Sequence, residues 1–242
     1  MFGKTIVYAH RGASGSAPEN TMSAFKKAVS MGSHGIECDV QMTKDGKLII
    51  CHDELLDRTT NGKGFIKDRT LEQIKTLDAG SWFGEAYTGE RIPLLEELLE
   101  LIKQSGIYFN LELKTGIVQY NGLEDKVVDM VKSYGLLERT IFSSFNHYSI
   151  FEIKDKYPEA FTGALYMAGL YQPWEYLKSV KCDCAHPFYL AAQPVMVEGL
   201  LRNGYTVNTF TVDDVKTAAM LTHAGVEGII TNHPERVLEI LK

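Results

Sequence analysis

Strand-like and helix-like segments alternate regularly along this chain, and this alternation constrains its fold more than any other feature of the sequence. Short runs rich in Val, Ile, Phe and Tyr predict strands, and amphipathic runs with apolar residues at helical spacing predict helices. The helices expected from residue 94 onward are 94–103, 123–133, 147–156, 174–179, 195–202, 215–222 and 234–241, and the strands expected between them are 108–114, 140–144, 161–166, 182–185, 205–212 and 228–231. Such alternation is typical of a parallel sheet covered by helices.

The length of 242 residues fits one TIM-type (β/α)8 barrel over residues 1–242. An open, doubly wound sheet is the competing architecture, but no Gly-x-Gly-x-x-Gly motif follows an early strand. Early apolar runs beginning at Ile6, Ile36 and Leu48 bring the number of expected strands to nine for eight places. The surplus lies in 36–52, where Asp45-Gly46 marks a turn, and this pair forms either a hairpin or a parallel pair with an extended return.

Residues 53–92 interrupt the alternation. Glycine-rich and irregular stretches occupy most of this segment, and only 71–77 has the pattern of a short helix. Forty residues without a clear element are unusual inside a compact domain. We therefore expect an inserted loop or small subdomain after the third strand.

Composition excludes several classes of partner. The net charge of −6 argues against nucleic acid and against a polybasic membrane anchor. The first residues lack the apolar stretch of a signal peptide, and no run of eighteen apolar residues predicts a membrane span. The four cysteines form no Cys-x-x-Cys pair and lie in strand-like segments. We therefore expect a reduced, cytoplasmic protein, while its oligomeric state stays open.

Two carboxylates in the second strand suggest a cation site. Glu37 and Asp39 are two residues apart in an apolar run, so their side chains share one face about 6–7 Å apart. Burying both without a partner would cost several kcal/mol. A salt bridge to Lys or Arg is the plain alternative to a metal. Thirteen residues after Asp39, the next apolar run ends at His52.

Other strand ends carry the rest of the reactive groups. In a barrel of this kind, the groups that do chemistry lie at the carboxyl ends of the strands. These ends hold His10 with Arg11 and Glu112 with Lys114. Either histidine alone is more often structural than catalytic, and Glu112 and Lys114 could simply pair with each other. Their joint placement on neighbouring strands favours a functional site.

The chemistry of this set points to phosphoester cleavage. Three carboxylates without cysteine are the ligands of a hard cation such as Mg²⁺ or Ca²⁺, with Mn²⁺ also possible, rather than of zinc. Arg11 offers a planar fork to phosphate oxygens, and Lys114 offers a point charge. Two histidines, one protonated and one neutral, supply an acid and a base.

Several sequence blocks carry a family resemblance. These blocks are 9–21 (AHRGASGSAPENT), 36–46 (IECDVQMTKDG), 51–53 (CHD), 110–114 (NLELK), 144–145 (SF) and 228–234 (GIITNHP). In this order, and over nearly the whole chain, they resemble the glycerophosphodiester phosphodiesterase family. The resemblance implies a TIM-type barrel with an insertion after His52. It also implies hydrolysis of glycerophosphodiesters to an alcohol and sn-glycerol 3-phosphate.

The resemblance also assigns roles by position. It implies that Glu37, Asp39 and Glu112 hold the metal and that His10 and His52 are the acid–base pair, with His10 favoured as the base. It further places Arg11 and Lys114 on phosphate and Asn20 at the metal shell or the substrate. Phe210 stands where the family usually has Trp; it keeps an aromatic wall for the substrate but departs from the pattern.

Two other functions compete with this one. A lysophospholipase D would cleave lipid-bearing substrates at the same centre and needs an apolar rim, to which the aromatic residues Trp82, Phe83, Tyr171 and Trp174 could contribute. A barrel that only binds a phosphorylated ligand is the alternative from another class. It is disfavoured because every acid, base and ligand position is intact.

Overall fold

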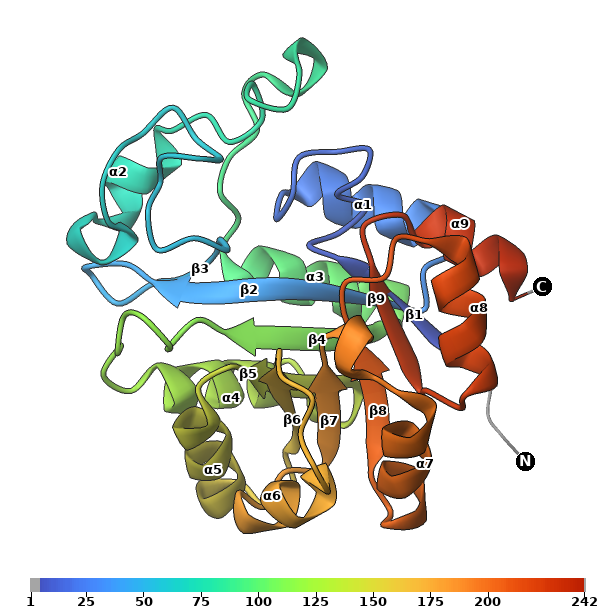
Figure 1. Cartoon of the computed structure of the whole chain (residues 1–242). Helices are drawn as coiled ribbons and strands as arrows, with labels where there is room; N and C mark the ends of the chain where they lie inside the picture. Colours follow the sequence, from blue (N-terminus) through green and yellow to red (C-terminus); the bar gives the residue numbers. More distant parts are fainter. Residues whose placement is uncertain (1–4, 242) are drawn as a thin grey trace.

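Parallel strands form a closed barrel in this protein, confirming the predicted TIM-type fold. The computed structural model describes residues 5–241. Within this range eight parallel strands follow one another around the barrel in the order β1, β2, β4, β5, β6, β7, β8 and β9. The barrel closes because β1 pairs with both β2 and β9. Helices surround the strands (Figure 1).

The observed elements follow the predicted alternation closely. The strands are β1 Ile6–His10, β2 Gly35–Met42, β3 Leu48–Ile50, β4 Tyr108–Leu113, β5 Thr140–Ser144, β6 Phe161–Tyr166, β7 Cys184–Pro187, β8 Thr206–Thr209 and β9 Gly228–Thr231. The helices are α1 Met22–Ser30, α2 Leu71–Lys75, α3 Leu95–Ser105, α4 Leu123–Ser133, α5 His147–Lys156, α6 Pro173–Ser179, α7 Pro194–Arg202, α8 Val215–His223 and α9 Pro234–Ile240. Short 3₁₀ turns are η1 Ile66–Asp68, η2 Glu85–Tyr87, η3 Leu137–Arg139 and η4 Tyr189–Ala191.

The surplus ninth strand forms a hairpin with the second. β3 pairs antiparallel with β2, and Val40 faces Ile50 across the pair. The hairpin prediction for 36–52 is therefore the correct one of the two. In this register Asp39 lies opposite Cys51, whose amide donates to the carbonyl of Asp39 at 2.9 Å. β3 thus ends two residues before His52, and the chain then enters the loop that follows.

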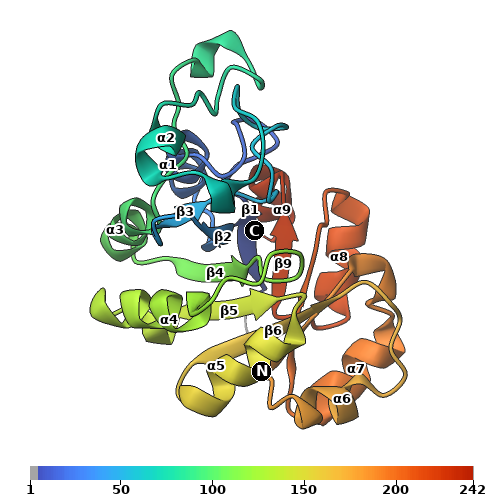
Figure 2. The ribbon, with the colours of Figure 1, turned by 90° about the vertical axis from the view of Figure 1, so that its left-hand side faces the viewer.

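Residues 53–92 lie beside the barrel as a separate projection with little regular structure (Figures 1 and 2). The segment holds only η1, α2 and η2. Five of its apolar side chains form a small cluster with Ile49 of β3 and with Cys51. The five are Leu56, Ile66, Ile74, Ala79 and Ile92. This cluster anchors the segment on β3, immediately beside the strand end that carries His52.

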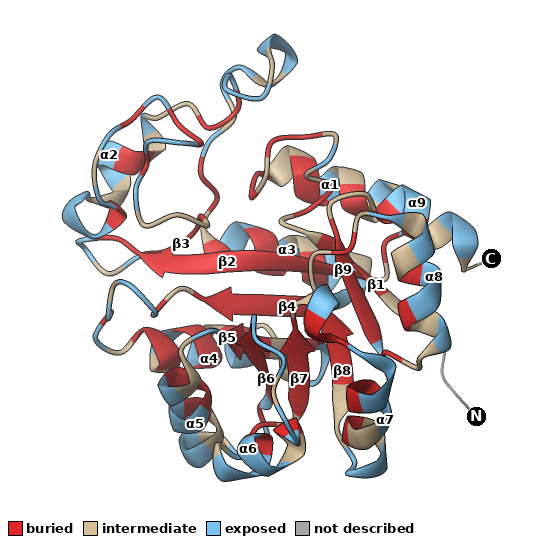
Figure 3. Cartoon of the chain, viewed as in Figure 1, coloured by how far each residue is buried: buried red, intermediate tan, exposed pale blue. Residues whose placement is uncertain are grey.

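The barrel strands are almost wholly buried, and the helices bury one face against them (Figure 3). All eight residues of β2 are buried, as are those of β7 and β9. α3 shows the pattern on a helix, since Leu95, Leu98, Leu99 and Ile102 are buried at helical spacing. The barrel is therefore a rigid support, and side chains at the carboxyl ends of its strands are held on regular elements.

Candidate active site

Three buried carboxylates meet at the carboxyl ends of two adjacent strands. β2 supplies Glu37 and Asp39, and the neighbouring β4 supplies Glu112. Asp39 and Glu112 are paired in the strand register, which brings residues 73 positions apart side by side. One oxygen of each carboxylate lies within 4.8 Å of the others. The structure therefore brings together the three residues that the sequence marked as metal ligands.

The electrostatics of this cluster are unfavourable without added positive charge. Burial raises the pKa of Glu37 well above its ordinary value, and the charges of Asp39 and Glu112 add to that rise. Burial, together with Asp39, raises the pKa of Glu112 to about 7. Ionising all three carboxylates in this buried space is costly, as expected when like charges share a site.

Two cations and one amide offset part of this charge on Asp39. Arg11 places Nε 3.3 Å from Oδ2 of Asp39, and Lys114 places Nζ 3.8 Å from Oδ1. Asn20 donates from Nδ2 to Oδ2 of Asp39 at 2.8 Å. Burial opposes the ionisation of Asp39, but the charges of Arg11 and Lys114 hold its pKa well below the usual range. Lys114 also donates to Glu112 at 2.8 Å, so the pairing considered as an alternative is present within the cluster.

The donor set fits a hard divalent cation. All three groups are carboxylates, the ligand type that Mg²⁺, Ca²⁺ and Mn²⁺ prefer. Among the described residues, Oδ1 of Asp39 is buried and has no hydrogen-bond partner. A buried carboxylate oxygen normally has a partner, so this oxygen marks a place for an additional ligand.

His10 stands beside the carboxylates and is oriented from the other end of the chain. Its Nε2 lies 3.9 Å from Oε2 of Glu37, and its Nδ1 lies 2.7 Å from Oδ1 of Asn232. Nδ2 of Asn232 donates to Asp213 at 2.7 Å, which directs Oδ1 toward His10. Nδ1 of His10 must therefore carry the proton, and the lone pair is on Nε2. Burial, together with the charge of Arg11, lowers the pKa of His10 to about 4, so this ring is neutral at pH 7.

His52 is oriented by its own neighbour in the chain. Its Nδ1 lies 2.7 Å from Oδ1 of Asp53. Since a carboxylate accepts, Nδ1 carries a proton and Nε2 is the atom directed elsewhere. The charge of His52 also lowers the pKa of Asp39, but by less than the charges of Arg11 and Lys114 do. Each histidine therefore has one ring nitrogen engaged in orientation; His10 lies beside Glu37, and His52 is near enough for its charge to act on Asp39.

Some residues at this site were not singled out from the sequence as functional. Gln41, wholly buried, holds the chain around His52, with Nε2 within 3.1 Å of the carbonyl oxygens of residues 51, 52 and 53. Asp213 holds Asn232, and Arg58 bridges Asp53 and Glu19. Asp53 adjoins His52, Asn232 directly follows a predicted strand, and Glu19 and Gln41 fall within the family-like blocks 9–21 and 36–46. Arg58 and Asp213 carried no such signal.

Two aromatic or imidazole groups do not join the carboxylate cluster. Phe210 directly follows β8, and its ring packs edge-on to Phe145 at 5.7 Å and lies 6.1 Å from Phe188. Within residues 5–241, neither a hydrogen bond nor an ion pair joins Phe210 to the cluster. His186, in β7, is wholly buried with Nε2 2.9 Å from Nδ2 of Asn208.

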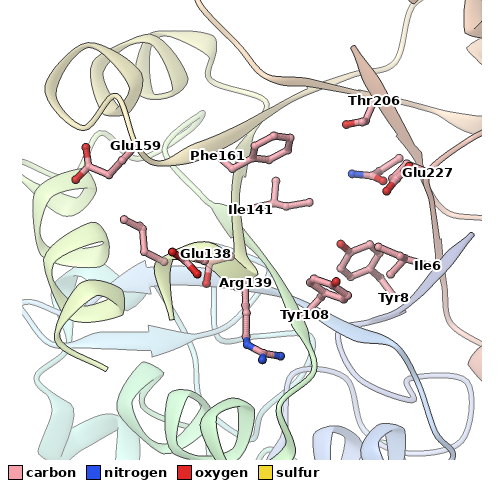
Figure 4. Close-up of a pocket in the computed structure, with 13 residues that line it drawn as sticks. Ile6, Tyr8, Tyr108, Glu138, Arg139, Ile141, Glu159, Phe161, Thr206 and Glu227 are labelled. Carbon is pink, nitrogen blue, oxygen red and sulfur yellow. The ribbon is translucent and has the colours of Figure 1, made fainter. Parts of the chain in front are cut away.

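A cavity of about 440 Å³ lies at the opposite end of the barrel, where the strands begin. Figure 4 shows Tyr8, Tyr108 and Glu227 among the side chains around it. Its lining includes neither histidine of the candidate site and none of the three carboxylates. The candidate site therefore does not coincide with this cavity and lies at the carboxyl ends of the strands.

Known proteins resemble this chain over its full length. It is 48% identical to a glycerophosphodiester phosphodiesterase of Caldanaerobacter subterraneus subsp. tengcongensis over 239 residues, covering 99% of this chain and 98% of the relative. It is 36% identical to a glycerophosphodiester phosphodiesterase of Bacillus subtilis, covering 99% of this chain and 87% of that protein.

Solved structures agree with these relatives. A phosphodiesterase of Oleispira antarctica, solved in complex with the product sn-glycerol-3-phosphate, superposes with a TM-score of 0.87 at 34% identity, covering 97% of this chain and 95% of that one. A glycerophosphodiester phosphodiesterase of Agrobacterium tumefaciens superposes with a TM-score of 0.86 at 28% identity, covering 97% and 99%. The sequence profile of the glycerophosphoryl diester phosphodiesterase family matches residues 10–236. This chain therefore belongs to the glycerophosphoryl diester phosphodiesterase family.

Proposed function

We propose that this chain hydrolyses glycerophosphodiesters to an alcohol and sn-glycerol 3-phosphate. The observation that carries the proposal is the position of His10, whose Nε2 lies 3.9 Å from Oε2 of Glu37 at the edge of the carboxylate cluster. A neutral imidazole beside a hard-cation site suits proton abstraction next to a phosphoryl group. The Oleispira relative was solved with sn-glycerol-3-phosphate bound as its product, which is the product we propose for this chain.

Glu37, Asp39 and Glu112 would hold a divalent cation, Mg²⁺ or Ca²⁺, with Mn²⁺ as a further candidate. Two observations support this assignment: their buried oxygens lie within 4.8 Å of one another, and Oδ1 of Asp39 accepts no hydrogen bond from a described residue. When bound, such an ion supplies positive charge that polarises the phosphoryl group and orients the attacking hydroxyl. It would also relieve the repulsion that raises the pKa of Glu37 and Glu112.

The two histidines divide the proton transfers between them. Nε2 of His10 takes the proton of the attacking oxygen as the new P–O bond forms. Nε2 of His52 gives its proton to the departing alkoxide as the old P–O bond breaks. The attacking oxygen is that of water or that of the neighbouring glycerol hydroxyl. In the second case a transient cyclic phosphate forms, and water then breaks one of its ring P–O bonds to give sn-glycerol 3-phosphate. Detection of that cyclic phosphate by ³¹P NMR distinguishes the two nucleophiles.

Arg11 and Lys114 would bind the non-bridging phosphate oxygens. Arg11 is suited to this role because its Nε makes no hydrogen bond to any described residue, although it lies near Asp39. Lys114 brings its ammonium to the same carboxylates. Asn20 would contact the metal shell through Asp39, and Phe210 would form an aromatic wall for the glycerol or the alcohol.

A panel of glycerophosphodiesters assayed with Mg²⁺, Ca²⁺ and Mn²⁺ tests the proposal. We expect release of sn-glycerol 3-phosphate that requires one of these ions and stops when it is chelated. Turnover that EDTA leaves untouched would remove the metal role. Absence of turnover for every diester, despite binding of sn-glycerol 3-phosphate, would instead favour a barrel that only binds a phosphorylated ligand.

Cleavage of lysophospholipids by the same centre is the second candidate. Exposed aromatic residues in the inserted segment favour it, since Trp82 and Phe83 are 42% and 36% exposed and stack edge-on at 5.6 Å. Trp174, another aromatic considered for an apolar rim, packs against the barrel core instead. Comparing glycerophosphocholine with lysophosphatidylcholine separates the two functions. A preference for the lysolipid that is lost in Trp82→Ala would favour the second.

The setting of this activity is proposed on similar grounds. We propose a cytoplasmic protein, because all four cysteines are buried and free of disulfides. Within residues 5–241, the structure contains no helix that could cross a bilayer. We further propose that residues 1–242 form one catalytic domain that includes the insertion 53–92. We propose that this protein acts on a small glycerophosphodiester and does not bind nucleic acid.

A further inference from the structure

Arg58 joins two acidic side chains at the edge of the candidate active site. It donates to Asp53 from Nε at 2.7 Å and from Nη2 at 3.0 Å. It also donates to Glu19 from Nη1 and from Nη2, each at 2.8 Å. The guanidinium thus makes a two-bond contact with each carboxylate, a geometry that suits its planar fork.

Each of these carboxylates leads to a group of the proposed chemistry. Asp53 receives Nδ1 of His52 at 2.7 Å. Glu19 receives Nη1 of Arg11 at 2.8 Å. Arg58 therefore lies between Asp53 and Glu19. Asp53 is the partner of His52, the proposed proton donor, and Glu19 is the partner of Arg11, the proposed phosphate clamp.

The backbone and the side chain at Asp53 are held by different residues. Gln41 fixes the backbone through the carbonyl oxygens of 51, 52 and 53. Among the described residues, the carboxylate of Asp53 is hydrogen-bonded only to His52 and Arg58. Since His52 is the ring that needs orienting, Arg58 is the group that keeps this carboxylate in place for it.

The inserted segment places Arg58 firmly. Leu56, two residues before it, is buried in the cluster of apolar side chains that this segment forms. Two residues after it, Thr60 donates from its hydroxyl to the carbonyl of Leu56 at 2.6 Å. The chain on both sides of Arg58 is thus fixed by contacts that do not involve the active site.

We propose that Arg58 is a positioning residue, which orients His52 through Asp53 and Arg11 through Glu19. This inference rests on the proposed function and adds a role for 53–92, which is to align the proton donor with the phosphate clamp. Arg58 itself is 44% exposed at its side chain and contacts neither of the two groups directly. Lysine keeps the charge but has no planar fork with which to make both two-bond contacts.

The leaving group of the substrate provides the test. Two glycerol phosphodiesters are compared, one with choline and one with p-nitrophenol as the leaving alcohol. The choline alkoxide needs a proton from His52 as it departs, whereas p-nitrophenolate leaves without one. In Arg58→Ala we expect KM to rise for both diesters, because Arg11 loses the contact that orients it on the phosphate. We expect kcat to fall about 10²-fold for the choline diester, as misplacement of a catalytic group does, and to change little for the p-nitrophenyl diester. Guanidinium at a low, non-denaturing concentration should restore part of the loss.

Controls keep the role of Arg58 distinct from a general effect on the fold. Arg69→Ala removes an exposed arginine of the same segment and should leave both rates unchanged. Within the described part of the chain, the side chain of Arg69 donates only to the carbonyl of Lys63. Arg58→Gln replaces the alanine variant if that one does not fold. Equal losses of kcat on both diesters, or no loss of kcat on the choline diester, would overturn the inference. If the unmodified protein cleaves neither diester, it is the proposed function that fails.

Discussion

Nδ1 of His10, the last residue of β1, lies 2.7 Å from Oδ1 of Asn232, which follows β9. The two strands are neighbours in the barrel, although the two residues are 222 positions apart in the sequence. Ser14 adds a hydroxyl 2.7 Å from the same oxygen. This contact fixes the tautomer of His10 and aims Nε2 at the carboxylate cluster.

Asn232→Ala should lower kcat without loss of the fold, because the imidazole of His10 then loses the acceptor that orients it. We expect a fall of about 10- to 100-fold, the size found when the partner of a metal-site histidine is removed. Steady-state kinetics with glycerophosphocholine measures it. Asn203→Ala, at an exposed asparagine that donates to the carbonyl of Gly199, is the matched control. An unchanged kcat in Asn232→Ala would show that this contact has no role in orientation.

The two histidines should respond differently to the leaving group. His52→Ala should lower turnover of the choline diester by about 10²–10⁴-fold, since it removes the proton donor, and should spare the p-nitrophenyl diester. His10→Ala should lower turnover of both, because each reaction needs the base. His223→Ala, at an exposed histidine on α8, should affect neither. The opposite pattern for the two variants would exchange the assignments of acid and base.

Glu112→Gln should separate metal binding from stability. The pKa of Glu112 is raised from 4.5 to about 7, so its contribution to stability is present below pH 4.5 and is lost as the pH rises through 7. In chelator at pH 8, the neutral variant should therefore be at least as stable as the unmodified protein. It should also lose the rise in melting temperature that Mg²⁺, Ca²⁺ or Mn²⁺ produces.

Thermal unfolding with and without each ion measures both effects. Glu100→Gln, on the exposed face of α3, is the control for removing one carboxylate. A Glu112→Gln protein that is still stabilised by the ions as strongly as the unmodified protein would exclude Glu112 as a ligand.

His186 should make the protein sensitive to acid. Burial lowers its pKa from 6.5 to about 3, so the folded protein keeps this ring neutral while the unfolded chain protonates it. The stability it contributes is present above pH 6.5 and is lost as the pH falls toward 3, with a slope approaching about 1.4 kcal/mol per pH unit. In His186→Gln, the free energy of unfolding measured with urea should depend less steeply on pH between pH 6 and about 4.

The flattening should be partial, because His10 has a pKa lowered to about 4 and acts in the same direction. His223→Gln, at an exposed ring, should leave the slope as it is. The comparison uses slopes, so any loss of packing in the His186 variant does not affect it. Equal slopes in the His186 variant and the unmodified protein would contradict the prediction.

Gln41→Ala should lower both stability and turnover. The change leaves three carbonyl groups at 51–53 and the hydroxyl of Tyr120 without their present partner. Buried polar groups without partners cost about 1–3 kcal/mol, and urea unfolding measures that loss. Turnover of the choline diester should fall with it, because the loop that carries His52 loosens. Gln104→Ala, on the exposed surface of α3, should change neither.

The periodicity of apolar residues by itself determined most of the secondary structure. α4, α5, β5, β6 and β9 begin and end at the predicted residues. This success has a physical reason, since buried strands and one-sided helices impose different spacings on apolar side chains. The carboxyl ends of those strands also identified the carboxylates and histidines, because parallel strands bring their ends to one edge.

Only the tertiary structure decided how β3 pairs and what orients the reactive groups. A turn at 45–46 was compatible with either direction, and the antiparallel ladder settles it. The contacts of His10 with Asn232 and of Arg58 with Glu19 join residues 222 and 39 positions apart. No spacing in the chain encodes such contacts, since closure of the barrel and packing of the inserted segment create them. The types of reactive group are thus readable from the sequence, whereas their orientation is a property of the fold.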